Sequence, residues 1–186
     1  IQLIHIFEDE WVNNKEIVKS RLKNLFKLTD NKVYGRKCVI KEVNTKDKTK
    51  FLNDNHIQGT IGSKVNLGLY YNDELVSIMT FGKGRVVMNG VKNEWELLRF
   101  CNKINHSVTG GASKLFKHFI KKYNPNNVIS YADRRWSQGN LYPQIGFNKT
   151  HTSSPNYFYI INTERVHRFK YRKNLLIKDG FDKNKT

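Results

Sequence analysis

Two arginines and a tryptophan stand next to one another in the sequence, at Arg134, Arg135 and Trp136. Guanidinium groups bind phosphate oxygens, and a large aromatic ring stacks on nucleobases, so this trio suits contact with both parts of a nucleotide. We therefore predict that the loop containing these residues binds nucleic acid. The alternative is a surface loop that is anchored by a buried tryptophan.

Basic and aromatic residues also alternate near the end of the chain, where Phe169 and Tyr171 lie among cations. Exposed aromatic side chains without a partner are unfavourable, and closely spaced cations suit contact with a phosphate backbone. The alternative is the solvated face of a helix. We predict that five residues of this tail bind phosphates: Arg165, Arg168, Lys170, Arg172 and Lys173.

A glycine turn precedes a segment in which the apolar residues have helical spacing. The first amide groups of a helix have no partner within the helix, and the helix dipole is positive at that end. Gly110, Gly111, Ala112 and Ser113 are therefore candidates for binding a phosphate or another anion. A glycine turn is also common in proteins that have no such ligand.

The charge of the chain points to the same class of partner. Its 186 residues include 33 lysines and arginines against 16 aspartates and glutamates, which gives a formal net charge of +17. This charge favours a polyanion, and DNA is the partner that we expect. A lysine-rich surface that only keeps the protein in solution is the alternative.

Two cysteines, Cys38 and Cys101, have neither a C-x-x-C pattern nor a histidine at metal-like spacing, so we predict no disulfide framework and no metal site. The sequence contains no apolar run of about 18 residues, as a membrane span requires, and no basic segment near its start. We expect a cytoplasmic protein without membrane contact. Because the first residue is Ile1, we also expect a fragment or a processed product.

The elements that must position these residues are those of an α/β protein. Asn72-Asp73 suits a tight turn between two strands, and a polar segment near residue 30 marks a boundary. We expect a strand and a helix over 1–30, a main domain over 31–162 and a basic tail over 163–186. The predicted strands span 1–7, 36–43, 65–71, 74–81, 94–102, 128–133 and 157–161, and the predicted helices span 15–26, 44–55 and 113–123.

The order hairpin, strand, glycine turn, helix and strand, followed by residues 140–147, resembles the GNAT family of N-acyltransferases from about residue 33 to residue 161. The resemblance implies a central mixed sheet flanked by helices, with the glycine turn holding the pyrophosphate of acyl-coenzyme A. The family pattern has Arg or Gln where this chain has Ser107. That departure argues against coenzyme A as a ligand.

A shorter stretch is similar to the Mom family of phage DNA-modifying proteins, which are GNAT-like and act on adenine. If the chain is a transferase, this resemblance implies that Asp133 acts as a base or orients a nucleobase amine, and that Tyr131 or Tyr142 supplies a proton or stacks on the base. The alternatives are an Asp133 paired with a neighbouring arginine and two tyrosines packed in the core. The stretch comprises Tyr131-Ala132-Asp133, Gly139, Tyr142 and Gly146-Phe147.

Segments over almost the whole chain resemble the C-terminal part of phage homing-endonuclease-like proteins, in which a nuclease domain similar to very-short-patch-repair enzymes precedes a GNAT-like domain. The resemblance implies that 1–30 joins such a nuclease, that any divalent metal belongs to it, and that the host is an infected or prophage-bearing bacterium. Glu8, Asp9 and Glu10 are expected to cap the following helix. The segments are 1–11, 36–38, 51–59, 110–116 and 130–137.

The function that we predict is DNA binding within a phage homing-endonuclease-like or DNA-modification protein. The alternative is a GNAT-like N-acyltransferase that modifies a DNA base or another amine with acyl-coenzyme A or a related donor. A catalytically silent module that joins proteins is a third possibility. DNA binding that weakens with salt distinguishes the first hypothesis, and saturable coenzyme-A binding distinguishes the second.

Overall fold

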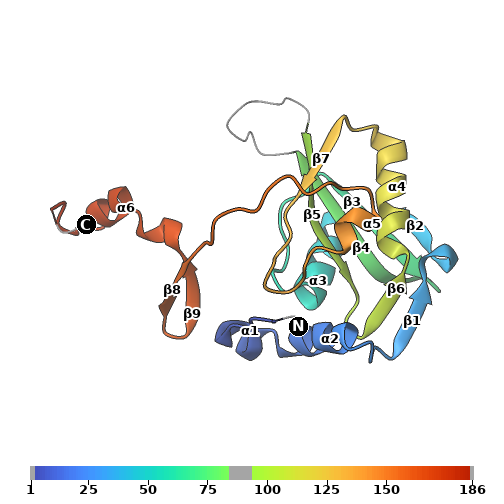
Figure 1. The fold of residues 1–186 in the computed structure, drawn as a ribbon, viewed down its shortest axis with the longest axis horizontal. Helices are drawn as coiled ribbons and strands as arrows, with labels where there is room; N and C mark the ends of the chain where they lie inside the picture. The colour runs from blue at the N-terminus through green and yellow to red at the C-terminus, as the bar shows by residue number, and fades with distance from the viewer. Residues whose placement is uncertain (1–2, 84–93, 185–186) are drawn as a thin grey trace.

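A five-stranded mixed sheet forms the centre of the computed structural model, which describes residues 3–83 and 94–184 (Figure 1). The strand order is β2-β3-β4-β5-β7, with antiparallel neighbours except for the parallel pair β5 and β7. This architecture confirms the expected α/β class with a central mixed sheet flanked by helices. The strands are β2 (Val39–Glu42), β3 (Val65–Tyr71), β4 (Glu74–Lys83), β5 (Glu94–Asn102) and β7 (Asn127–Ser130).

Two helices cover the two faces of this sheet (Figure 1). Successive side chains of a strand point to opposite faces, so Met79 of β4 packs in the cluster that contains α4 (Gly111–Tyr123), whereas Ile78 packs against α3 (Thr45–Asn55). The face under α4 holds the larger core, in which the rings of Phe81 and Phe119 stack. Burial of these side chains on both faces provides most of the driving force for folding.

Local sequence signals account for several of these elements. The side chain of Asn44 accepts a hydrogen bond from the amide of Asp47 at 2.9 Å and so caps α3. Asn72 and Asp73 both have positive φ, as a tight turn between β3 and β4 requires. The predicted hairpin and the helices over 44–55 and 113–123 are therefore confirmed within one or two residues.

A second, two-stranded sheet lies beside the first. β1 (Asn31–Tyr34) pairs in parallel with β6 (His106–Thr109), which leads directly into α4 (Figure 1). The short helix η1 (Gly35–Lys37) follows β1 and contacts the start of α4. The predicted strand over 36–43 is thus shorter than expected, because its first residues form this helical turn.

The N-terminal segment differs from the prediction of a buried strand over 1–7. Residues 3–7 form no strand, and residues 1 and 2 lie outside the described part of the chain. A strand needs a neighbour to satisfy its backbone groups, and the described sheets place none beside this segment. The chain continues instead into α1 (Glu8–Asn13) and α2 (Lys15–Leu25), the second of which confirms the predicted helix over 15–26.

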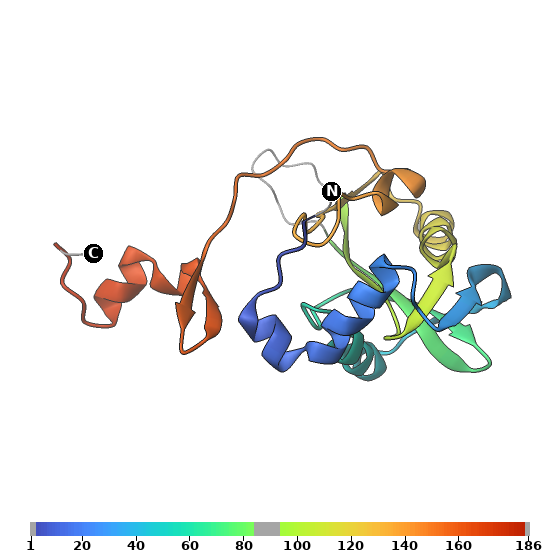
Figure 2. The ribbon, with the colours of Figure 1, turned by 60° about the horizontal axis from the view of Figure 1, so that its bottom comes forward.

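The C-terminal region forms a separate hairpin. β8 (Phe158–Ile161) pairs with β9 (Glu164–His167) rather than with the central sheet, and η2 (Arg168–Tyr171) and α6 (Lys173–Lys178) follow. Figures 1 and 2 show this unit standing away from the sheet at the end of a long connection, with β9 next to α1. The expected boundary after residue 162 falls within the turn of this hairpin. None of the described helices combines the length and the apolar character needed to cross a membrane.

Candidate nucleic-acid interface

The loop that follows β7 places its three predicted nucleic-acid residues in different surroundings. Trp136 is only 6% exposed, and the guanidinium of Arg21 lies 4.5 Å from its ring centre. Arg135 is partly buried among carboxylates, whereas Arg134 is exposed. Burial of the tryptophan favours the alternative of an anchored loop, and it leaves Arg134 as the cation of the trio that faces solvent.

Glu10 of α1 is the centre of a charged network and is only 2% exposed. One of its oxygens accepts hydrogen bonds from Arg135 Nη2 at 3.0 Å and from Arg165 Nη2 at 2.9 Å. Arg165 Nε also donates to Asp9 at 2.8 Å. The ring of Phe7 is near both guanidiniums, at 4.8 Å from Arg135 and 4.1 Å from Arg165. We call this set (Phe7, Asp9, Glu10, Asp133, Arg135 and Arg165) the Glu10 network.

The Glu10 network joins three distant parts of the sequence. Asp9 and Glu10 come from α1, Arg135 comes from the loop after β7, and Arg165 comes from β9. A buried charge is tolerated when it is paired and hydrogen-bonded, and both conditions hold here. The adjacent acidic residues 8–10 were expected to cap the helix that begins at Lys15. They form the first turn of α1 instead, where Glu10 accepts a hydrogen bond from the amide of Phe7 and, together with Asp9, fastens the C-terminal hairpin and the Arg135 loop.

Asp133 belongs to the same network. Its carboxylate accepts hydrogen bonds from Arg135 Nε at 3.2 Å and Arg135 Nη2 at 2.8 Å, as the alternative for this residue anticipated. The hydroxyl of Tyr142 accepts a hydrogen bond from Ser130 Oγ at 3.2 Å and donates one to the carbonyl of Tyr131 at 3.2 Å. The ring of Tyr131 is exposed. The structure therefore brings the three candidate transferase residues near one another, with Asp133 and Tyr142 in structural contacts.

The C-terminal hairpin and the residues after it present the remaining predicted cations. Arg168 lies over the rings of Tyr157 and Phe169 at 5.2 and 5.4 Å, and Arg172 lies over Phe169 at 4.0 Å. Phe169 is 49% exposed. In the part of the chain that the structure describes, no carboxylate pairs with four of these cations: Arg168, Lys170, Arg172 and Lys173. We call residues 157–178 the hairpin–tail surface.

The glycine turn begins α4, and η1 covers part of it. Gly111 and Ala112 are buried, and Gly110, with φ of 74°, is exposed. A Cβ atom placed on Gly35 of η1 would lie 3.0 Å from the amide nitrogen of Gly111, so the backbone of η1 rests directly on the turn. These residues do not fit the pyrophosphate of acyl-coenzyme A.

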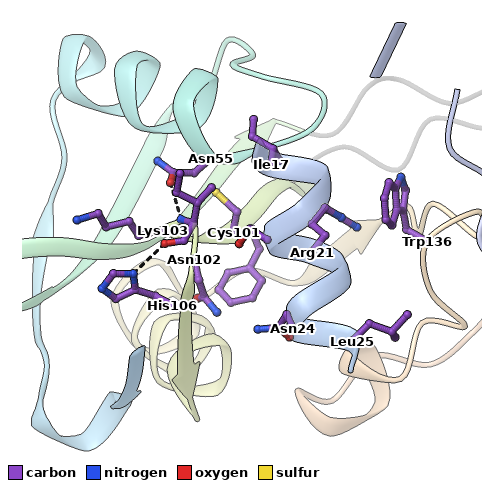
Figure 3. A pocket seen from close by; sticks show the side chains of 13 residues that line it. Ile17, Arg21, Asn24, Leu25, Asn55, Cys101, Asn102, Lys103, His106 and Trp136 are labelled. Carbon is purple, nitrogen blue, oxygen red and sulfur yellow. Dashed lines mark hydrogen bonds between the residues drawn. The ribbon is translucent and has the colours of Figure 1, made fainter. Parts of the chain in front are cut away.

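A pocket of about 260 Å³ lies between α2, the end of β5 and Trp136 (Figure 3). Its polar groups hold the chain together: Asn55 accepts a hydrogen bond from the amide of Ile104 at 2.7 Å, and the carbonyl of Ile104 lies 2.9 Å from His106 Nδ1. Burial raises the pKa of Cys101 in its wall to about 12, which keeps the thiol protonated and unreactive. Ser20 of α2 also accepts a hydrogen bond from the amide of Asn105 at 2.7 Å, so the polar groups of the pocket join α2 and α3 to the connection after β5.

Two features of this region depend on packing between distant segments. Arg21 was not singled out, although burial lowers its pKa and its guanidinium stacks on Trp136. Burial beside Arg99 and Arg21 also lowers the pKa of His56 to about 3, so this histidine is neutral. No local sequence pattern predicts the contact between Arg21 and Trp136 or the burial of His56, since both involve distant segments. Across the described residues, no three His, Cys, Asp or Glu side chains are grouped as a metal site requires.

Comparisons with known proteins identify similar folds only. No family model matches the sequence, and no curated protein matches it. A transcriptional regulator from Bacillus halodurans C-125 has 13% identity and a TM-score of 0.49, covering 65% of this chain and 99% of its own. A GNAT-family acetyltransferase from Streptococcus pneumoniae TIGR4 has 15% identity and a TM-score of 0.46, covering 64% and 98%. A ribosomal-protein-alanine N-acetyltransferase from Brucella melitensis has 16% identity and a TM-score of 0.49, covering 65% and 99%.

Proposed function

We propose that the chain binds DNA through the hairpin–tail surface, as part of a phage homing-endonuclease-like or DNA-modifying protein. One observation carries the proposal: Arg168 and Arg172 are held over exposed aromatic rings with no carboxylate partner among the described residues. A guanidinium fixed by a ring keeps its donors free for phosphate oxygens and gives up little side-chain freedom on binding.

The composition of the hairpin–tail surface supports the same function. Residues 157–178 contain six lysines and arginines and a single acidic residue, Glu164. Four aromatic rings of this surface are substantially exposed: Tyr157, Phe158, Tyr159 and Phe169. Cations that follow a backbone and rings that stack on bases are the two components of single-strand binding, while the cations alone suffice for a duplex.

The Glu10 network gives this surface a fixed position on the domain. Arg165 of β9 pairs with Asp9 and Glu10, so the hairpin is attached through paired charges while the cations beyond it remain available. Contacts to phosphates set position rather than sequence preference. We therefore assign this surface to backbone binding, and any chemistry on DNA to other parts of the protein.

Fluorescence anisotropy with a labelled oligonucleotide, single-stranded or duplex, tests the proposal. The double substitution Arg168→Ala and Arg172→Ala should weaken binding by about tenfold for each phosphate that is no longer bound at roughly 0.1 M salt. It should also reduce the slope of log K against log salt by about 0.9 for each such phosphate of a duplex, or about 0.7 for a single strand. The matched control removes two exposed cations from other helices, Lys46→Ala and Lys121→Ala. Equally weakened binding in both variants would show that only net charge matters and would overturn the proposal.

An acyltransferase is the alternative function, and acetyltransferases are among the chains of similar fold. It requires that coenzyme A bind to the turn at the start of α4, where Gly111 and Ala112 are buried. The burial of these residues is why we place DNA binding first. Saturable binding of acetyl-coenzyme A that persists in the Arg168→Ala and Arg172→Ala variant would favour this alternative.

A further inference from the structure

Residues 31–38 lie along the path into α4. β1 runs parallel to β6 in a continuous register, with Val33 opposite Val108 and Tyr34 opposite Thr109. β6 ends at Thr109, and the next residues form the glycine turn. A segment paired to β6 in this way is therefore directed at the start of α4.

The segment reaches the turn at Gly35. A Cβ atom on this residue would lie 3.0 Å from the nitrogen and 3.1 Å from the Cα of Gly111, so a larger residue here would push the two backbones apart by a few tenths of an ångström. Val33 and Cys38 on either side are buried in the main core. The approach is thus fixed from both directions by packed side chains.

Lys114, one turn into α4, holds the segment from the other side. Its ammonium group donates hydrogen bonds to the carbonyl of Gly35 at 3.0 Å and to the carbonyl of Cys38. Charged hydrogen bonds to partly buried carbonyls are stronger than those between neutral groups. Lys114 therefore fastens residues 35–38 to the first turn of α4.

We infer that residues 31–38 block the start of α4, and that the chain takes no acyl-coenzyme A there. In the GNAT family the glycine turn holds the cofactor pyrophosphate, whereas here the backbone of η1 lies against Gly111 of that turn. The domain thereby combines a GNAT-like fold with a glycine turn that is packed against its own chain. This inference is independent of the proposed DNA binding.

Isothermal titration of the full chain with coenzyme A tests the inference. We expect no saturable binding at the glycine turn. Because coenzyme A is itself a polyanion, the same titration is made with the Arg168→Ala and Arg172→Ala variant. Binding that disappears in this variant belongs to the hairpin–tail surface and agrees with the inference. Saturable binding that persists in it would overturn the inference.

Hydrogen–deuterium exchange provides a readout that needs no ligand. Amides of residues 31–38 should be protected in the unmodified chain, and Lys114→Met should speed their exchange by about tenfold because it removes the charged hydrogen bonds. The control Lys117→Met changes an exposed lysine of the same helix and should leave the exchange unchanged. Exchange of residues 31–38 at the rate of an unstructured peptide in the unmodified chain would contradict the inference.

Discussion

Two groups of arginines in this molecule have the same side chain and opposite surroundings. Arg135 and Arg165 lie in the Glu10 network, where carboxylates accept their hydrogen bonds and their side chains are 24% and 16% exposed. Arg168 and Arg172 lie on the hairpin–tail surface, where exposed rings support them. Arg165 and Arg168 are close neighbours in the sequence, yet one fastens the hairpin and the other has no carboxylate partner among the described residues.

The difference shows that a cation's partner decides its role. A guanidinium that is already satisfied by a carboxylate has little to gain from a phosphate, because the exchange replaces one charged hydrogen bond with another. A guanidinium stacked on a ring retains its donors and gains a full set of such bonds. A count of basic residues therefore overstates the number of cations that are available to DNA.

The largest effect is expected from removal of the carboxylate at the centre of the Glu10 network. Glu10→Ala leaves Arg135 and Arg165 partly buried without their shared partner, and we expect the free energy of unfolding to fall by about 3 kcal/mol. Urea denaturation followed by circular dichroism measures this change. Glu16→Ala, which removes an exposed carboxylate paired with Lys19 at 2.8 Å, is the control and should unfold at an unchanged midpoint. Equal midpoints for both variants would show that the network contributes nothing.

A third basic cluster contains a histidine beside two arginines. A proton added to this histidine is poorly solvated and is repelled by the arginines. His56 lies near Arg99 and Arg21, and burial lowers its pKa to about 3 from an ordinary 6.5. The unfolded chain therefore takes up a proton as the pH falls below 6.5, while the folded chain does so only near 3. As the pH falls from 6.5 to about 3, the free energy of unfolding should decrease by up to about 1.4 kcal/mol for each pH unit. Above pH 6.5 the contribution of His56 is constant.

The His56→Gln variant tests this pH dependence. Unfolding midpoints in urea at pH 7 and pH 5 should differ less in the variant than in the unmodified chain. The control is His151→Gln, which changes an exposed histidine. A difference between the two pH values that is identical in all three proteins would assign the pH dependence to other groups.

The smallest expected effect comes from two neighbours in the loop after β7. Arg134→Ala should weaken DNA binding by about threefold without changing stability, because this side chain is exposed and contributes at most a single phosphate contact. Arg135→Ala should lower the free energy of unfolding by about 1.5 kcal/mol, since it removes charged hydrogen bonds to Glu10 and Asp133. Anisotropy and denaturation on both variants separate the two roles. DNA affinity that falls further for Arg135→Ala than for Arg134→Ala would reverse the assignment.

Short-range signals in the sequence determined much of the fold. The Asn72-Asp73 turn, the apolar spacing of α4 and the helix that begins next to Asn44 each depend on residues within a few positions, and each is found where it was predicted. The strand predicted over 1–7 is absent from residues 3–7, because a strand depends on a distant neighbour. The strand over 157–161 was expected as the last of the main domain, and it pairs instead with β9.

The sequence alone sets the excess of positive charge, the order of the elements and the residue types of the proposed phosphate-binding surface. Which of these residues remain available depends on how the whole chain packs. Arg135 is 125 positions from Glu10 in the sequence, Gly35 is 76 positions from Gly111, and no local pattern encodes such contacts. Pairing of charges and close contact between two backbone segments require distant residues to meet in space, so they follow from packing of the whole chain rather than from residue type.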